Sequence, residues 1–438
     1  MINAFKNHIQ NNLSLLTKSK LLIACSGGLD SVVLTHLCHE LGLDISLAHC
    51  NFNLRGTESD EDESFVIDLA DQLDFEVFVE SFNTEDYAKT HKISIQMAAR
   101  DLRYNWFFDL AEDLKFDYIL TAHHADDNLE TFLINLTRGS GLHGLTGIPE
   151  KNDAIIRPLL PFTREDLESY ANEKNLSWRE DSSNTSDKYL RNALRHRVIP
   201  ALKEINPEVI QGFKQTLSHL NDSADIVEES LNAVAKRAIV DIDDDYITFK
   251  ISEFKKVNNA KAYMYEMFKD YGFTAWNDVV NLLDAQSGKQ VLSETHRLIK
   301  DRKHLILTNR VTETHQSIEI SEQDNNLQTG IGTLVFNQVN TISNASKTQI
   351  FIDKGKLTYP LVLRQWQEGD AFYPSGMKGK KKLSKYFKDE KLSLVDKENI
   401  WLLTSNDDIV WILGRRADER FKVTKQTTKI LKITLKEV

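Results

Sequence analysis

The chain lacks the sequence features of membrane-spanning proteins, of secreted proteins and of proteins built on zinc sites or disulfides. Its 438 residues contain no apolar run long enough to span a membrane, and no apolar segment of the signal-peptide type follows the first residues. The three cysteines, Cys25, Cys38 and Cys50, form no C-x-x-C pair, so they provide no zinc or disulfide framework and are typical of a reducing cytosol. We therefore expect a cytoplasmic protein with no membrane partner.

Two further absences concern nucleotides and nucleic acids. No G-x-x-x-x-G-K-[ST] sequence is present, which argues against a Walker-type NTPase. Basic residues are outnumbered, with 54 Lys and Arg against 65 Asp and Glu and a formal net charge of −11. This average argues weakly against a nucleic-acid partner. Phosphate backbones bind to local patches, however, so the distribution of Lys and Arg matters more than their sum.

The first half of the chain alternates buried strands with helices. Strands are expected at 21–25, 45–49, 76–82 and 118–123, and helices at 30–41, 58–73, 94–114 and 125–137. Strands separated by helices predict right-handed crossovers, and therefore an α/β fold with a parallel sheet that has helices on both faces. Ligands of such sheets bind at the carboxyl ends of the strands.

The rest of the chain has a different pattern. Apolar residues spaced three or four apart from Phe213 to Val234 predict a long amphipathic helix, and 260–283 also has a helical pattern. Strands are expected at 359–366, 409–413 and 431–436. The expected domains are a first α/β domain at 1–205, a mainly helical middle domain at 206–315 and a small α+β carboxyl-terminal domain at 350–438.

The strongest motif is Ser26-Gly27-Gly28-Leu29-Asp30-Ser31, between the first strand and the first helix. Its glycines let the backbone approach a phosphate closely, and the free amides and dipole at the helix start attract an anion. Asp30 could hold Mg²⁺ against pyrophosphate oxygens. The alternative is a tight turn with an Asp or Ser cap. The strand-loop-helix context favours phosphate binding, and the pattern resembles the pyrophosphate loop (PP-loop) of the N-type ATP pyrophosphatases.

Two carboxylates follow the fourth expected strand. Asp127 and Glu130 are three residues apart after His123-His124, so a helix that begins near Ala125 would place both on one face. They could bind Mg²⁺ or an ammonium group. They could equally form an acidic first turn that complements the helix dipole.

Two arginines, Arg100 and Arg103, are also three apart on an expected helix. One of them could hold a phosphate bidentately. The alternative, most credible for Arg100, is a solvated face paired with nearby acids.

Positive charge is concentrated in two places. Residues 378–391 contain seven lysines against one Asp and one Glu, with Tyr386 and Phe387 among them. Basic residues interleaved with aromatics suit a nucleic-acid backbone and its stacking bases, although a solvated loop is the usual origin of a charge run. Arg191, Arg195 and Arg197 form a second basic cluster.

These segments, together and in this order, resemble the tRNA(Ile)-lysidine synthetase family. Further matches are His49-Cys50-Asn51-Phe52-Asn53-Leu54-Arg55, Arg157-Pro158-Leu159-Leu160, Asp181-Ser182-Ser183-Asn184 followed by Arg191-Asn192 and Arg195, Gly369-Asp370, Lys382-Leu383-Ser384 and Gly414-Arg415-Arg416. The resemblance spans nearly the whole chain. Two departures are Phe52, where the family usually has His, and Lys397, where Arg is usual.

The resemblance implies a PP-loop, HUP-like catalytic domain, followed by two tRNA-binding domains, and a two-step reaction. ATP would adenylate the C2 oxygen of the wobble cytidine in the isoleucine tRNA with a CAU anticodon, which releases pyrophosphate. The amine of free L-lysine would then displace AMP and leave lysidine.

The resemblance also implies residue roles. The ATP-binding residues would be Ser26, Gly27, Gly28, Leu29, Asp30, Ser31 and His49, with Asp30 also on Mg²⁺. The catalytic residues would be Asp30, Arg103 and Asp127, with Arg103 at the α-phosphate or the activated base. Asp127 and Glu130 would bind the lysine ammonium. The tRNA contacts would be Arg191, Arg195 and Arg197 behind the catalytic domain, and Lys380, Lys381, Lys382 and Lys385 near the acceptor region.

The nearest alternative is a PP-loop tRNA thiolase that uses the same adenylation step. Such enzymes generally need paired cysteines to deliver sulfur, and the three cysteines here have no sulfur-relay spacing. Two other candidates are an ammonia-using synthetase and a non-catalytic tRNA-binding protein that uses ATP to change shape. The sequence leaves the oligomeric state open, with a homodimer as one candidate.

Overall fold

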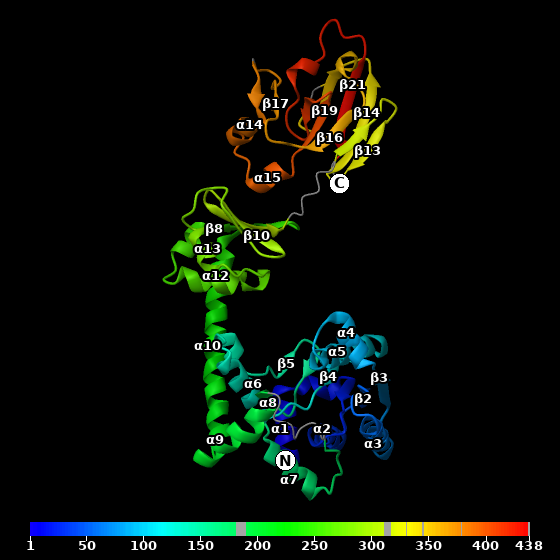
Figure 1. The fold of residues 1–438 in the computed structure, drawn as a ribbon, viewed down its shortest axis with the longest axis vertical. Coiled ribbons are helices and arrows are strands. Elements are labelled where there is room, and N and C mark those ends of the chain that lie inside the picture. Colours follow the sequence, from blue (N-terminus) through cyan, green and yellow to red (C-terminus); the bar gives the residue numbers. More distant parts are fainter. Residues whose placement is uncertain (181–189, 311–316, 330, 344–345, 378, 437–438) are drawn as a thin grey trace. The chain divides into compact units, whose positions relative to one another are not determined.

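The computed structural model describes residues 1–180, 190–310, 317–329, 331–343, 346–377 and 379–436. The chain forms two compact units, Met1–Glu228 and Glu229–Val438, each with hydrophobic cores of its own (Figure 1). Within the described ranges, no helix combines the length and the apolar character needed to cross a membrane.

A six-stranded sheet forms the centre of the first unit. Its order is β3-β2-β1-β4-β6-β5, and all neighbouring strands are parallel except β5 and β6. The strands are β1 (Leu21–Ala24), β2 (Ile45–Asn51), β3 (Val77–Ser81), β4 (Tyr118–Leu120), β5 (Lys151–Asn152) and β6 (Ile155–Ile156). The strand order reverses between β1 and β4. The carboxyl ends of these two strands therefore mark the point where ligands of open α/β sheets bind.

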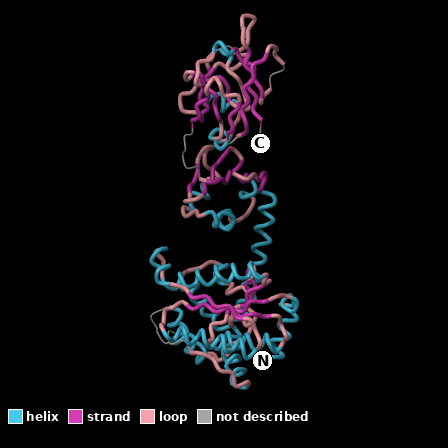
Figure 2. Tube along the Cα trace, turned by 90° about the vertical axis from the view of Figure 1, so that its right-hand side faces the viewer, coloured by secondary structure: helices cyan, strands magenta, loops and turns pink. Residues whose placement is uncertain are grey.

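Helices cover both faces of this sheet, as Figure 2 shows. Leu21 and Ile23 of β1 belong to one core cluster, whereas Leu22 between them belongs to another. This alternation is expected for a strand that is buried on both faces. The helices are α1 (Ile2–Asn12), α2 (Leu29–Glu40), α3 (Thr57–Leu73), α4 (Thr84–His91), α5 (Ile95–Leu114), α6 (Ala125–Thr137), α7 (Arg164–Glu173), α8 (Leu190–Ala193), α9 (Ile199–Ile205) and α10 (Val209–Ala238), the last of which continues into the second unit.

The second unit begins with a five-stranded antiparallel sheet of order β7-β8-β11-β10-β9. Its elements are β7 (Ile239–Ile242), β8 (Tyr246–Lys250), α11 (Ile251–Lys255), α12 (Ala260–Phe268), α13 (Trp276–Asn281), β9 (Gln290–Leu292), β10 (His296–Asp301) and β11 (His304–Asn309). The sequence predicted helices here but not this sheet, because apolar runs as short as those of β10 and β11 do not distinguish strand from helix. The predicted helix 260–283 is interrupted at Gly272, whose φ is +74°.

Two four-stranded sheets follow, with orders β12-β16-β19-β20 and β13-β14-β21-β15. Leu363 and Ile433, one from each sheet, belong to a single core cluster. The strands are β12 (Ser317–Ile320), β13 (Asn326–Thr329), β14 (Gly332–Val339), β15 (Gln349–Asp353), β16 (Leu361–Gln365), β19 (Trp401–Ser405), β20 (Asp408–Ile412) and β21 (Ile430–Lys436). A short pair, β17 (Ala371–Phe372) and β18 (Lys381–Lys382), precedes α14 (Leu383–Asp389) and α15 (Leu394–Glu398). The predicted α+β character of this region is confirmed.

Candidate active site

The motif Ser26–Ser31 forms the loop between β1 and α2, at the reversal of strand order. Gly27 has a φ of +81°, and a Cβ there would lie 3.2 Å from the side chain of Phe65. Glycine is therefore required at this position. Gly28 is the N-cap of α2, so the next amides have no partner within the helix. The Gly27 carbonyl accepts the backbone N–H of Arg179 at 2.9 Å, which holds the loop from outside.

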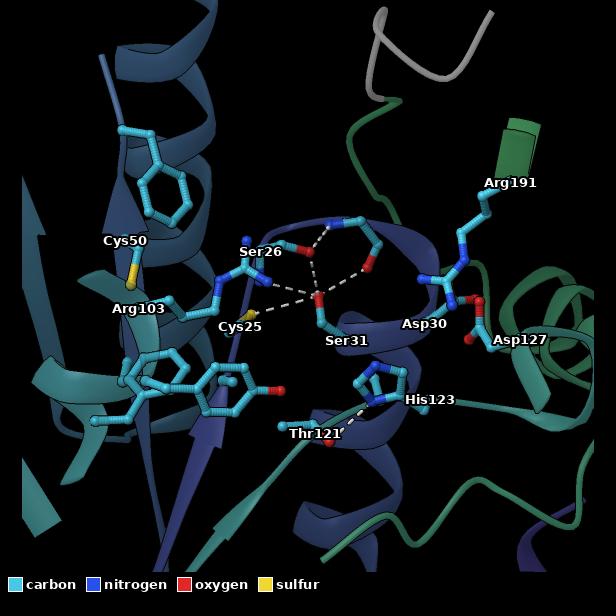
Figure 3. Close-up of a pocket in the computed structure, with 17 residues that line it drawn as sticks. Cys25, Ser26, Asp30, Ser31, Cys50, Arg103, Thr121, His123, Asp127 and Arg191 are labelled. Atoms are coloured by element: carbon cyan, nitrogen blue, oxygen red, sulfur yellow. Dashed lines mark hydrogen bonds between the residues drawn. The ribbon is translucent and has the colours of Figure 1, made fainter. Parts of the chain in front are cut away.

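Ser31 stabilises this loop from within. Its hydroxyl donates to the Gly28 carbonyl at 2.9 Å and accepts the backbone N–H of Ser26 at 3.2 Å (Figure 3). Ser31 is buried, whereas Ser26 is exposed. The side chain of Leu29 lies in the hydrophobic core, so only its backbone is available to a ligand. The loop thus presents backbone amides and the Ser26 hydroxyl.

Asp30 presents a carboxylate oxygen without a partner. Within the described residues, its Oδ1 is buried and makes no hydrogen bond, and its Oδ2 lies 3.6 Å from Nε2 of His124. No group of three or more His, Cys, Asp and Glu side chains in those residues could hold a metal alone. Mg²⁺ at nucleotide sites is usually held by one or two carboxylates together with phosphates. Asp30 therefore fits a magnesium ion that arrives with a nucleotide.

His124, the N-cap of α6, is surrounded by three carboxylates. Burial acts to lower its pKa, but Asp126, Asp30 and Asp127 outweigh burial and raise the pKa to about 10. One contact opposes this charge, because Nδ1 lies 3.3 Å from the Asp126 amide and would accept its N–H only when unprotonated. Three carboxylates outweigh that weak contact. The charged ring in turn holds the Asp127 pKa below its usual value against the effect of burial.

Arg103, on α5, lies across the pocket from Asp127, as Figure 3 shows. Its guanidinium is 5.2 Å from the ring centroid of Phe52. In the part of the chain that the structure describes, this guanidinium has no hydrogen-bond or salt-bridge partner. Arg100, three residues earlier, is exposed and lies over Tyr104 at 4.7 Å. Arg103 is therefore the arginine of this helix that is available to a phosphate.

Asp127 and Glu130 lie on one face of α6, as predicted, and both are paired with arginines. Arg195 donates from Nε to Glu130 Oε1 at 2.6 Å, and from Nη2 to Asp127 Oδ1 at 3.0 Å and Glu130 Oε2 at 3.1 Å. Nε of Arg191 lies 3.4 Å from Glu130 Oε2. Burial raises the pKa of Glu130, and Arg195 offsets this only in part.

The location predicted for Arg191 and Arg195 was therefore wrong. Neither lies behind the catalytic domain, because Arg191 lines the pocket and Arg195 binds its carboxylates. Arg197 is on the same π-helical turn as Arg195, Leu194–Val198. A contact of the three with tRNA stays a prediction. The sequence did not reveal this placement, because α8 and the turn are short and have no clear period. The motif Asp181-Ser182-Ser183-Asn184 lies outside the described residues.

His49 lines a neighbouring cavity at the end of β2. Its Nδ1 lies 3.0 Å from the Cys25 carbonyl, and burial lowers its pKa. The two cavities share Ser26, Phe52 and Arg103 among their lining residues. His49 is thus beside the phosphate loop, and its expected role in ATP binding stays a prediction.

Two lining residues, Thr121 and His123, had no predicted role. Thr121 Oγ1 lies 3.0 Å from His123 Nδ1, and burial lowers the pKa of His123 to about 4, so its ring is neutral near pH 7. The predicted strand 118–123 ends at Leu120 in the structure, which frees both residues to line the pocket. Their position directly after β4, at the reversal of strand order, is the signal that could have identified them.

The basic stretch of the second unit lies on β18 and α14. Lys380, Lys382 and Lys385 are exposed, and Lys381 pairs with Asp389 at 2.8 Å. Tyr386 and Phe387, which the sequence suggested as stacking partners for bases, are buried in a core cluster. That suggestion was wrong because their spacing on α14 turns both rings inward.

Comparison with known proteins agrees with this geometry. Residues 1–202 match the PP-loop domain family, residues 242–310 the TilS substrate binding domain and residues 361–434 the TilS substrate C-terminal domain. The chain is 38% identical to the tRNA(Ile)-lysidine synthase of Parabacteroides distasonis, over 98% of this chain and 99% of that protein. It is 37% identical to the enzyme of the same name from Bacteroides thetaiotaomicron, over 97% of each chain. The phosphate loop lies where the strand order reverses, and relatives that share one name match almost the whole length of the chain. The chain therefore belongs to the tRNA(Ile)-lysidine synthase family.

Proposed function

We propose that this enzyme uses ATP to adenylate the C2 oxygen of the wobble cytidine in the isoleucine tRNA with a CAU anticodon. It then joins free L-lysine to C2 and releases AMP, the pyrophosphate having left in the first step. The observation that supports this best is one pocket that combines the phosphate loop, the unpaired Arg103 guanidinium and the Asp127 carboxylate. Loop and arginine suit a phosphate, and the carboxylate suits a cationic amino acid.

In the first step, the chain's residues would hold ATP and make the base oxygen a leaving group. The loop amides and Arg103 would bind the α-phosphate and stabilise the charge that develops on it. Mg²⁺, held by Asp30, would neutralise the charge on the departing pyrophosphate. His49 lines the second cavity, so ATP would extend across both cavities.

In the second step, Asp127 and Glu130 would bind the ammonium of lysine, whose amine then attacks C2. The amine has an ordinary pKa of ~10.4 and must lose a proton before it attacks. A carboxylate beside an ammonium raises the pKa of that ammonium, so binding through this pair favours the charged form. The pair would therefore select and hold the substrate.

The cysteines argue against the thiolase alternative. Cys25 and Cys38 are fully buried, and burial raises the pKa of both thiols. Burial also raises the pKa of Cys50 to about 12. Sulfur delivery needs a reactive thiolate, and thiols in apolar surroundings stay protonated.

The decisive experiment supplies the protein with ATP, labelled L-lysine and unmodified isoleucine tRNA with a CAU anticodon. We expect label in the tRNA at the wobble cytidine, with one AMP and one pyrophosphate per lysine joined. A tRNA with uridine at the wobble position is the matched control and should stay unlabelled. Incorporation of sulfur, or ATP use without label in the tRNA, would contradict the proposal. A homodimer and a cytoplasmic location stay predictions.

A further inference from the structure

Arg195 occupies the two carboxylates that the proposed function assigns to the lysine ammonium. We propose that Arg195 is an internal competitor of the substrate, and that lysine binds by displacing its guanidinium from Asp127 and Glu130. The inference rests on the proposed lysine subsite and adds how that subsite is filled before lysine arrives.

All four carboxylate oxygens of the pair have a partner in the structure. Both oxygens of Glu130 accept hydrogen bonds from Arg195, at 2.6 and 3.1 Å. Oδ1 of Asp127 accepts from Arg195 at 3.0 Å, and Oδ2 accepts the backbone N–H of His124 at 3.1 Å. Each oxygen has a second lone pair, but a lysine ammonium would share every oxygen with an existing donor, and three of the four with Arg195, while Arg195 stays in place.

The charges around the pair lead to the same conclusion. Asp127 and Glu130 contribute two negative charges, and Arg195 and Arg191 contribute two positive ones within 3.4 Å. The charged ring of His124 also lies 3.4 Å from Asp127 Oδ2. A further cation would gain no net attraction here. A buried carboxylate without a cation is costly, however, so departure of the guanidinium requires another cation in its place. The process is thus an exchange of one cation for another.

Arg195 is the partner that is able to move. Its side chain is 29% exposed, whereas that of Glu130 is 1% exposed. Arg195 lies on a π-helical turn between the short helices α8 and α9, a type of turn that is frequent at functional sites. The carboxylates, in contrast, are fixed on the 13-residue helix α6. Lysine can therefore enter by a rotation of one long side chain.

The test measures lysine affinity by calorimetry, without tRNA, for the parent protein and for Arg195→Gln. If the open form of the parent is populated to about a tenth, removal of the competitor tightens lysine binding about tenfold. In steady-state assays, the KM for lysine should also fall in this variant. An arginine that merely supports the fold would raise KM, not lower it.

A second measurement, the Tm with and without lysine, tests the inference even if the variant is less stable than the parent. Arg195→Gln leaves buried carboxylates short of one cation, so its Tm should fall, and added lysine should raise it more than it raises the parent's Tm. Arg195→Lys keeps a cation but loses the forked contacts, so its lysine affinity should lie between the two. Arg164→Gln removes a guanidinium that pairs with Glu168 on α7 and should leave lysine affinity unchanged.

The outcomes separate this inference from the proposed function. Glu130→Gln should abolish lysine binding, and unchanged affinity there would overturn the lysine subsite itself. Suppose that Glu130→Gln no longer binds lysine but both Arg195 variants bind lysine no more tightly than the parent. The proposed competition by Arg195 is then overturned, and the lysine subsite stands.

Discussion

The guanidinium of Arg103 lies over the ring of Phe52, 5.2 Å from its centroid. Phe52 is itself stacked on Phe82 at 5.8 Å, and Phe82 meets Trp106 edge-on at 6.2 Å. A row of three aromatic side chains thus supports an arginine that has no salt bridge of its own among the described residues. These aromatic side chains hold the Arg103 guanidinium in the pocket without neutralising its positive charge.

Phe52→Ala should therefore weaken catalysis by misplacing Arg103. A cation–π contact contributes ~0.5–1 kcal/mol at exposed sites, so tRNA-dependent ATP–pyrophosphate exchange should slow about two- to fivefold. Phe52→Tyr keeps the ring and should retain the parent rate. Equal rates for the Ala and Tyr variants would show that the ring does not position Arg103.

Asp30→Asn should abolish ATP–pyrophosphate exchange. The amide keeps the shape of the carboxylate but loses the charge that binds Mg²⁺. Exchange is measured over a magnesium titration, with Asp113→Asn on the exposed face of α5 as the control. Exchange that persists in Asp30→Asn at ordinary magnesium concentrations would refute the metal role of Asp30.

Gly27→Ala should destabilise the first unit, whereas Gly28→Ala should not. At Gly27, a side chain would adopt an unfavourable φ of +81° and press on Phe65, at a cost of roughly 1–2 kcal/mol. At Gly28, a Cβ would make only an ordinary contact, 3.5 Å from Ser26 Oγ. Urea unfolding compares the two, and equal midpoints would contradict the strain argument.

Ionisation of Asp126 should make the free energy of unfolding depend on pH in the acidic range. Burial acts to raise its pKa, but His124, the Arg164 amide and Lys203 lower it well below the usual value. A lowered carboxylate pKa contributes stability that is fully present above the unfolded-state pKa, ~3.9, and is lost as pH falls through the folded-state pKa. Asp126→Asn should thus be less stable than the parent at pH 7, by about 1–3 kcal/mol.

That difference should shrink in urea melts below about pH 4, because there the Asp126 carboxyl binds a proton in the unfolded parent while it is still ionised in the folded one. Asp109→Asn, on the exposed face of α5, is the control and should track the parent at every pH. A difference between Asp126→Asn and the parent that stays constant with pH would mean that charge is not the cause.

Replacement of Lys380, Lys381 and Lys382 by Ala should weaken tRNA binding and reduce its salt dependence. Each lost phosphate contact lowers the slope of log affinity against log salt by ~0.7–0.9. Lys381 already pairs with Asp389, so we expect a reduction of about two contacts. Replacement of Lys89 in α4, and of Lys92 and Lys115 directly after α4 and α5, removes equal charge from the first unit and should leave the slope unchanged. Equal slopes for both triple variants would remove this surface from the tRNA site.

The elements that carry the motifs were predictable, because their signals are local. Glycine and serine spacing, a buried strand and an amphipathic helix define the loop Ser26–Ser31, and the interval of three residues defines the face of Asp127 and Glu130. The pairing of Arg195 with this face was not predictable, since 65 residues separate Arg195 from Glu130 and no period links them. The five-stranded sheet of the second unit was missed for the same reason, because pairing between short strands leaves little trace in either one.

The hydrogen bond from the Arg179 amide to the Gly27 carbonyl has a consequence for synthesis of the chain. Every residue of the loop emerges early from the ribosome, yet the contact that closes it comes from a residue made much later. A nascent chain that ends before Arg179 would contain the whole loop Ser26–Ser31 but would lack the hydrogen bond that holds the Gly27 carbonyl. Nucleotide affinity should therefore mature late in translation, when the first unit is nearly complete.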